Sequence, residues 1–208
     1  MSNNAIKTIA KNISLTDRQR QIIVGLMLGD GHLESRNNRT YRLKVEHSIG
    51  QKEYTDWLYA ELRDLVITEP QVKDQIVNGK KYQKYWFNTL SCGSLRFYGQ
   101  LFYQDKKKLI PKQISKFVSP LSLAIWFMDD GSLKSSQHRA RIINTQCFDL
   151  AGLERLQEMF RKLFNVHTTL RKQPEGYQMY IPSTEIEKFV EIVRPYIIPT
   201  MDYKIKLT

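Results

Sequence analysis

Two aspartates stand at matching places in two copies of one short pattern. Residues 23–31 read IVGLMLGDG, with Asp30 before the last glycine, and residues 123–131 read LAIWFMDDG, with Asp130 in the same place. Each apolar run is expected to form a helix that stops at its glycine. Because the C-terminus of a helix disfavours negative charge, a carboxylate placed there twice indicates a compensating cation such as a divalent metal. If the two helices pack side by side, Asp30 and Asp130 meet, and paired carboxylates on a basic protein are typical of metal-assisted phosphodiester cleavage.

The charge of the chain points to a polyanionic partner. The sequence has 32 Lys and Arg against 21 Asp and Glu, which gives a net charge of +11 and an isoelectric point near 9.6. The simplest partner for such an excess is nucleic acid; the alternative is a basic protein without one. A length of 208 residues allows one large domain or two smaller halves around a common core.

Several other classes of protein are disfavoured by what the sequence lacks. The two cysteines, Cys92 and Cys147, have no CxxC spacing, which argues against a zinc site or a disulfide framework and suits a reducing, intracellular compartment. The four histidines are scattered and are expected to be structural. Residues 1–12 do not resemble a secretory signal, and no apolar stretch approaches the ~20 residues of a membrane span.

The order helix, strands, helix, hairpin, helix is predicted twice along the chain. A capping box at Thr16–Gln19 opens the first motif helix, and Ser119-Pro120 opens the second. Each predicted half closes on an apolar segment with a proline, at 108–111 and 196–199. The other helices are expected at 54–65, 94–103, 153–164 and 183–193, where apolar residues recur at helical spacing.

Between these helices the sequence predicts strands and hairpins. Asn78-Gly79 is a strong two-residue turn signal, between strands at 75–77 and 82–90. Residues 174–176, Pro-Glu-Gly, are a looser equivalent between strands at 166–172 and 177–181.

The strands expected just after each motif helix carry basic residues. In residues 41–46 apolar and charged side chains alternate, which places Arg42 and Lys44 on one face of the predicted strand. In residues 138–144 Arg139 and Arg141 share a face in the same way. Two half-sheets with basic outer faces would form a saddle that lies along duplex nucleic acid.

The motifs together resemble those of the LAGLIDADG homing endonucleases in their single-chain, double-motif form. The resemblance covers roughly residues 15–206 and is carried by GLMLGD at 25–30, SLAIWFMDDG at 122–131, NTQ at 144–146 and IPTMDYK at 198–204. The second motif departs from the family name at residues 125–127, Ile-Trp-Phe, which are large for a tight helix seam. We interpret this as a feature of one branch of the family; the alternative is that both runs are ordinary buried helices.

The resemblance implies an α+β fold of two pseudo-symmetric αββαββα halves. Paired motif helices would lie at the interface, where the small residues Gly25, Gly29 and Ala124 permit close approach, and antiparallel sheets would form the DNA-binding saddle. The expected boundaries are 1–14 for an N-terminal extension, 15–112 for the first half and 113–208 for the second.

The resemblance also assigns roles at the site. Asp30 would serve the cleavage of one DNA strand and Asp130 that of the other, both holding Mg²⁺, a hard ion that takes oxygen ligands. Gly29 and Asp129 precede them and would contribute backbone carbonyls. Lys108 and Lys204 occupy the positions of active-site lysines, with solvated surface lysines as the alternative. Asn144 and Gln146 would line the water network of the second site or are polar residues at a strand end.

DNA contacts are expected from basic residues in the predicted strands and hairpins, although any single one is more often a solvated charge. In the first half these are Arg36, Arg39, Arg42, Lys44, Lys80, Lys81 and Lys84; in the second, Lys134, Arg139, Arg141, Arg171 and Lys172.

The residues and the resemblance together leave three hypotheses for the function. The leading one, implied by the resemblance, is an intron-encoded, site-specific endonuclease that cuts both DNA strands as a monomer and leaves short 3′ overhangs. It would use Mg²⁺, with Mn²⁺ as a substitute and Ca²⁺ binding without cleavage, in an organelle or a bacterial cytoplasm. The others are an RNA maturase that assists intron splicing and a DNA-binding protein without catalysis. Fold alone does not separate them, but an acid at each motif end favours cleavage.

Overall fold

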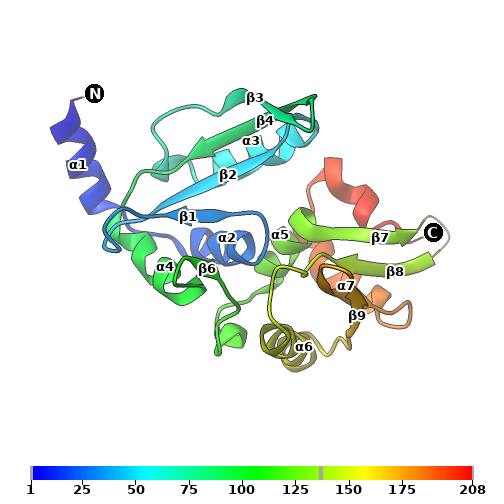
Figure 1. Cartoon of the computed structure of the whole chain (residues 1–208). Coiled ribbons are helices and arrows are strands. Elements are labelled where there is room, and N and C mark those ends of the chain that lie inside the picture. Colours follow the sequence, from blue (N-terminus) through cyan, green and yellow to red (C-terminus); the bar gives the residue numbers. More distant parts are fainter. Residues whose placement is uncertain (1, 136–137, 208) are drawn as a thin grey trace. The chain divides into compact units, whose positions relative to one another are not determined.

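The computed structural model describes residues 2–135 and 138–207 (Figure 1). The chain divides into two compact units. The first contains the chain up to Arg20 and Asp30–Leu101, and the second contains Gln21–Gly29 and the chain from Phe102 onward. The motif half of the first long helix, α2 (Asp17–Leu28), therefore packs with the second unit rather than with the sheet that follows it.

The first unit is built on a four-stranded antiparallel sheet of order β1-β2-β4-β3. The helix α3 (Lys52–Glu61) packs against β2 and β4 on one face of this sheet. An additional helix, α1 (Asn3–Asn12), precedes the predicted elements and begins at Ser2, whose hydroxyl accepts a hydrogen bond from the Ala5 N–H. The remaining elements of this unit are β1 (His32–Glu34), β2 (Arg42–Ser48), β3 (Gln71–Val77), β4 (Lys80–Asn88) and α4 (Arg96–Phe102), which runs into the second unit.

The second unit repeats this plan. Its antiparallel sheet has the order β7-β8-β10-β9, which matches the first sheet strand for strand, and α7 (Ile186–Val193) packs on β8. The repeated α+β architecture predicted from the sequence is thus confirmed. The other elements are α5 (Pro120–Asp130), α6 (Leu150–Phe164), β7 (Gly131–Ser135), β8 (His138–Ile143), β9 (Thr169–Gln173), β10 (Gly176–Ile181) and a small hairpin of β5 (Tyr103–Gln104) and β6 (Lys107–Lys108).

Short 3₁₀ helices connect these elements. They span Ile49–Gln51, Arg63–Leu65, Gly93–Leu95, Ile114–Lys116, Arg194–Tyr196 and Pro199–Lys204.

Local sequence signals account for where several elements begin and turn. The Gln19 N–H donates to Thr16 Oγ1 (3.2 Å) and the Thr16 N–H donates to Gln19 Oε1 (3.1 Å), which is the predicted capping box. Ser119 Oγ accepts the Ser122 N–H at the start of α5. Asn78 and Gly79 both have positive φ angles, 50° and 76°, as the hairpin turn between β3 and β4 requires. The strand predicted from Val166 begins only at Thr169.

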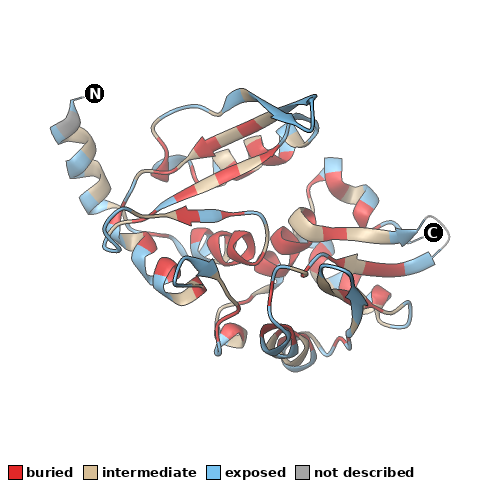
Figure 2. Cartoon of the chain, in the orientation of Figure 1, coloured by how far each residue is buried: buried red, intermediate tan, exposed pale blue. Residues whose placement is uncertain are grey.

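Glycines in the first motif allow α2 to approach α5 closely. A Cβ atom at Gly25 would lie 2.6 Å from the Ser122 carbonyl oxygen, and one at Gly29 would lie 2.7 Å from Asp129 Cβ. The close seam predicted for the motif helices is therefore present. The large residues of the second motif are accommodated in the core, because Trp126 packs on Phe160 and Phe127 on Phe189. Figure 2 shows α5 buried along most of its length.

The second motif helix ends at Asp130, just before its glycine, as predicted. Gly131 has a φ of −77° in extended backbone, which other residues also adopt. A Cβ atom there would lie 2.2 Å from the ring of Phe127. Gly131 is therefore required by the close approach of this ring and not by backbone conformation.

The tightness of the seam can be tested by adding a single methyl group. Ala has a higher helix propensity than Gly by ~1 kcal/mol, but in Gly25→Ala the new Cβ meets the backbone of α5. We expect a net loss of about 1–3 kcal/mol in the free energy of unfolding, measured by urea denaturation. The control is Gly93→Ala, whose Cβ meets no atom within 4 Å and should change stability by less than ~0.5 kcal/mol. A Gly25→Ala variant as stable as the wild type would contradict the tight seam.

Candidate active site

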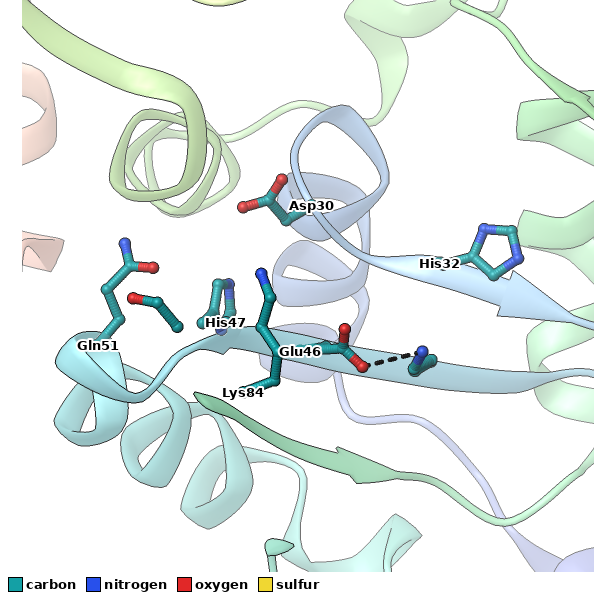
Figure 3. Close-up of a pocket in the computed structure, with 8 residues that line it drawn as sticks. Asp30, His32, Glu46, His47, Gln51 and Lys84 are labelled. Atoms are coloured by element: carbon teal, nitrogen blue, oxygen red, sulfur yellow. Dashed lines mark ion pairs between the residues drawn. The ribbon is translucent and has the colours of Figure 1, made fainter. Parts of the chain in front are cut away.

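Asp30 lies at the edge of a polar cleft of about 300 Å³ in the first unit. The cleft is lined by residues of the loop after α2 and of strands β1, β2 and β4 (Figure 3). Charged groups of both signs surround it, including Lys44, Glu46 and Lys84. A cleft of this size with a carboxylate at its rim can hold a phosphate group together with a hydrated cation.

His47 is a member of this site that the sequence analysis missed. It is buried, its Nδ1 lies 3.0 Å from Thr55 Oγ1, and one of its ring nitrogens lies within 4.8 Å of an Asp30 carboxylate oxygen. We expected the histidines to be structural, because none has the spacing of a helical metal site. Only the pairing of β2 with its neighbours in the sheet brings His47 to Asp30, and sequence spacing carries no signal of this.

The outer face of the first sheet carries the basic residues expected there. Leu43 and Val45 are buried, while Arg42 is exposed and Lys44 and Glu46 are half-buried, which confirms the predicted alternation. Lys80 and Lys84 project from β4 on this face, whereas Lys81 alternates to the other face and pairs with Asp74 at 2.8 Å. Arg36 and Arg39 are exposed in the loop between β1 and β2.

One carboxylate interrupts this basic face. Glu46 Oε2 lies 3.0 Å from Lys44 Nζ and 2.5 Å from Lys73 Nζ. Burial acts to raise the pKa of Glu46, but hydrogen bonds and charge attraction from Lys73 and Lys44 outweigh it and leave the pKa below its usual value. Glu46 therefore stays ionised and holds two lysines in place beside the cleft.

Lys108 and Lys204 both lie at the ends of motif helices. Lys108 Nζ donates to the Gly29 carbonyl (2.6 Å), just before Asp30. Lys204 is buried, and its Nζ donates to the carbonyl oxygens of Met128 and Phe127 at the end of α5. Cations at these positions compensate the negative field of a helix C-terminus. The burial of Lys204 excludes the alternative that it is a solvated surface lysine.

Asn144, one of the two polar residues predicted beside the second acid, is bonded to the backbone of Asp130. The Asn144 N–H donates to the Asp130 carbonyl (3.1 Å), and Asn144 Oδ1 accepts from Gln178 Nε2 (2.9 Å). The backbone carbonyl of Gln146 lies close to Gly176: a Cβ atom added at Gly176 would be 2.5 Å from the Gln146 carbonyl oxygen. Asn144 is thus fixed next to Asp130, and its side chain is oriented by β10.

The structure corrects the expectation for Arg139 and Arg141 as DNA contacts. They do share a face, but it is the face that packs on the helices: Arg139 pairs with Glu187 of α7 at 2.7 Å, and Arg141 is fully buried. On the outer face Lys134 and Arg171 instead lie over the ring of Tyr180, at 5.9 and 3.4 Å from its centroid. Lys172 is exposed on β9.

The donor atoms at the motif ends suit a divalent cation of the magnesium type. The Asp129 side chain packs directly on Gly29 within the second unit. Asp30 is the next residue after Gly29, and Asp130 is the next residue after Asp129. Carboxylate oxygens are the ligands that Mg²⁺ prefers. The Gly29 carbonyl, predicted as a further ligand, already accepts a hydrogen bond from Lys108. The separation of Asp30 from Asp130 stays a prediction.

The ion pairs of Glu46 predict how the stability of the protein depends on pH. Because the pKa of folded Glu46 lies below its unfolded value, the group contributes stability above the unfolded pKa and loses it as pH falls through the folded pKa. Between about pH 5 and about pH 3, the wild type should lose more stability than Glu46→Gln, measured by urea denaturation. The control, Glu175→Gln in the exposed β9–β10 turn, should follow the wild type. Identical acid profiles of wild type and Glu46→Gln would show that these ion pairs contribute nothing.

The chain is similar to proteins with known activities. The profile of the LAGLIDADG DNA endonuclease family matches residues 20–189. DNA endonuclease I-ChuI of Chlamydomonas applanata is 33% identical, over 93% of this chain and 96% of its own. Cytochrome b mRNA maturase bI2 of Debaryomyces hansenii is 28% identical, over 93% of this chain and 76% of its own. The solved structure of the homing endonuclease I-WcaI bound to its DNA recognition sequence superposes with a TM-score of 0.93 at 26% identity, covering 100% of this chain and 96% of that one.

Among the described residues, every helix is too short or too polar to cross a membrane.

Proposed function

Because the chain belongs to the LAGLIDADG DNA endonuclease family, we propose that it is a site-specific homing endonuclease that cuts both strands of a long DNA target. The observation that supports this best is the repeated construction of the two motif ends. Each presents an aspartate at the end of a buried helix, and each has a lysine ammonium bonded to the last carbonyls of that helix. An ammonium beside each acid places positive charge where cleavage of a phosphodiester requires it.

In the proposed reaction each motif end serves one strand. Asp30 and Asp130 would hold Mg²⁺, which lowers the pKa of bound water and neutralises charge on the scissile phosphate. A water oxygen attacks phosphorus, the bond to the 3′ oxygen of the neighbouring nucleotide breaks, and that oxygen takes up a proton. Mn²⁺ should substitute, and Ca²⁺ should bind without supporting cleavage.

The protein's own residues orient the reacting groups. The ammonium of Lys108, fixed on the Gly29 carbonyl, would orient the attacking water or stabilise negative charge on the phosphorane, and Lys204 would do the same beside Asp130. Asn144, anchored to the Asp130 backbone, would hold water of the second site. His47 would restrict the position of the Asp30 carboxylate from the other side of the cleft.

The outer faces of the two sheets are the proposed DNA-binding surfaces. In the first sheet Arg42, Lys44 and Lys84 would contact phosphates or bases, and in the second Lys134 and Arg171 would take the place that we first gave to Arg139 and Arg141. Phosphate contacts supply affinity that falls with salt, and base contacts supply specificity. Since both motifs are in one chain, we expect that the protein binds DNA as a monomer. The two cysteines without CxxC spacing suit an intracellular, reducing compartment.

An RNA maturase is the second candidate, because a relative over nearly the whole chain is a cytochrome b mRNA maturase. The two functions differ in their ligand: gel shifts with the duplex DNA of the intron-insertion site and with the intron RNA distinguish them. Tighter binding to the RNA, with no DNA cleavage, would favour the maturase.

The proposal predicts that neutralising either acid separates cleavage from binding. Asp30→Asn and Asp130→Asn each remove a metal ligand worth several kcal/mol of transition-state stabilisation, so linear product should form about a hundredfold more slowly or not at all. Neither acid carries the phosphate contacts, so DNA affinity should stay near the wild-type value. The assay is conversion of supercoiled plasmid to nicked and linear DNA in Mg²⁺, beside a gel shift on the same site.

A matched control guards against a general effect of lost charge. Asp64 is exposed on a 3₁₀ helix of the first unit, and Asp64→Asn should cut like the wild type. Wild-type rates of linear product from both Asp30→Asn and Asp130→Asn would show that these acids are not the catalytic ligands.

A further inference from the structure

Arg141 is the largest charged side chain in the core, and its place there needs an explanation. It lies on β8 with no exposed surface. Burial acts to lower its pKa, and a charge in the core is tolerated only when its hydrogen-bonding groups are satisfied. Its guanidinium donates to main-chain carbonyls: Nε to Lys204 (2.7 Å), Nη2 to Lys206, and Nη1 to Arg139 and Ala140.

Two of these carbonyls belong to the segment that carries Lys204. The Lys204 side chain in turn donates to Met128 and Phe127 at the end of α5. A continuous set of hydrogen bonds thus runs from β8 through the guanidinium to the Lys204 backbone, and from the Lys204 ammonium to the helix that ends in Asp130. All of these residues belong to the second unit.

The first half of the chain holds its lysine by other means. Leu33 of β1 pairs with Leu43, and Leu133 of β7 pairs with Arg141, so Leu43 occupies the place that corresponds to Arg141. Leu43 is fully buried and apolar. Lys108 pairs with Tyr103 in the β5–β6 hairpin, and the Leu109 N–H donates to the Phe102 carbonyl (2.9 Å).

Lys204, by contrast, ends a 3₁₀ helix. The backbone pairing of the β5–β6 hairpin fixes Lys108. The backbone of Lys204 is held instead by the hydrogen bond from the Arg141 guanidinium.

We propose that Arg141 is a positioning residue that sets the Lys204 ammonium beside the end of α5 and is needed for cleavage of the DNA strand served by the second site. The inference rests on the proposed catalytic role of Lys204. An arginine suits this task because its planar fork donates several hydrogen bonds in fixed directions, which a lysine cannot reproduce. Small misplacements of such groups are costly to a reaction rate.

The experiment measures the cutting of each DNA strand separately. A duplex target with one label on each strand is cleaved in Mg²⁺ by the wild type, Lys204→Met, Arg141→Met and Arg141→Lys. Lys204→Met identifies the strand served by the second site as the one whose cleavage slows most. Arg141→Met should slow that same strand by about tenfold or more and the other by less than about twofold, with DNA affinity unchanged in a gel shift. Arg161→Met, at an exposed arginine of α6, is the control and should cut both strands at the wild-type rate.

Hydrogen exchange gives a second readout that does not depend on cleavage. Backbone amides of residues 199–207 should exchange faster in Arg141→Met than in Arg161→Met. If Arg141→Met fails to fold, as judged by circular dichroism, Arg141→Lys is tested by the same two criteria.

The possible outcomes separate the inference from the proposal on which it rests. If Lys204→Met slows neither strand, or both alike, the proposed role of Lys204 is wrong. If Lys204→Met slows one strand while the Arg141 variants slow neither strand or both equally, Lys204 keeps its role and the positioning role of Arg141 is overturned.

Discussion

The close approach of α2 to α5 is the constraint on which the rest of the structure depends. Gly25 and Gly29 lack the Cβ atoms that would collide with Ser122 and Asp129. Because of this contact, the motif half of α2 packs with the second unit although the chain continues into the first. Just after this seam the backbone returns from the second unit to the first, and Asp30 is the first residue after that point.

A carboxylate at the end of each motif helix is electrostatically unfavourable, and a lysine compensates for it in both halves of the chain. A helix C-terminus carries a partial negative charge, and an aspartate there adds to it. Lys108 and Lys204 put an ammonium on the terminal carbonyls of each helix. The same lysines lie close to the reacting phosphates in the proposed mechanism, so one arrangement stabilises the helix ends and supplies positive charge for catalysis. The backbone of Lys108 is held by a hairpin and that of Lys204 by Arg141. The first half accordingly has Leu43 at the position that corresponds to Arg141.

Local signals in the sequence predicted much of this fold because they depend on neighbouring residues. The capping box at Thr16, the Asn78-Gly79 turn and the alternation of β2 each involve a few consecutive positions. Arg141 shows where such reasoning fails: the pattern placed it correctly with Arg139, but whether that face meets solvent or helices depends on α7 and on the C-terminal segment. It shares its face with the fully buried Ile143, a signal that could have revealed its position. His47 reaches Asp30 only through the pairing of strands, which no local pattern encodes.

The central claim is that the seam delivers one metal-binding carboxylate to each strand of the target. The most direct test is a crystal structure of the protein with its DNA target and Mn²⁺, with the metal located by anomalous scattering. The account predicts metal density at the scissile phosphates with carboxylate oxygens of Asp30 and Asp130 within about 2.5 Å of it. Metal bound elsewhere, or the two aspartates on opposite faces of the protein, would contradict it.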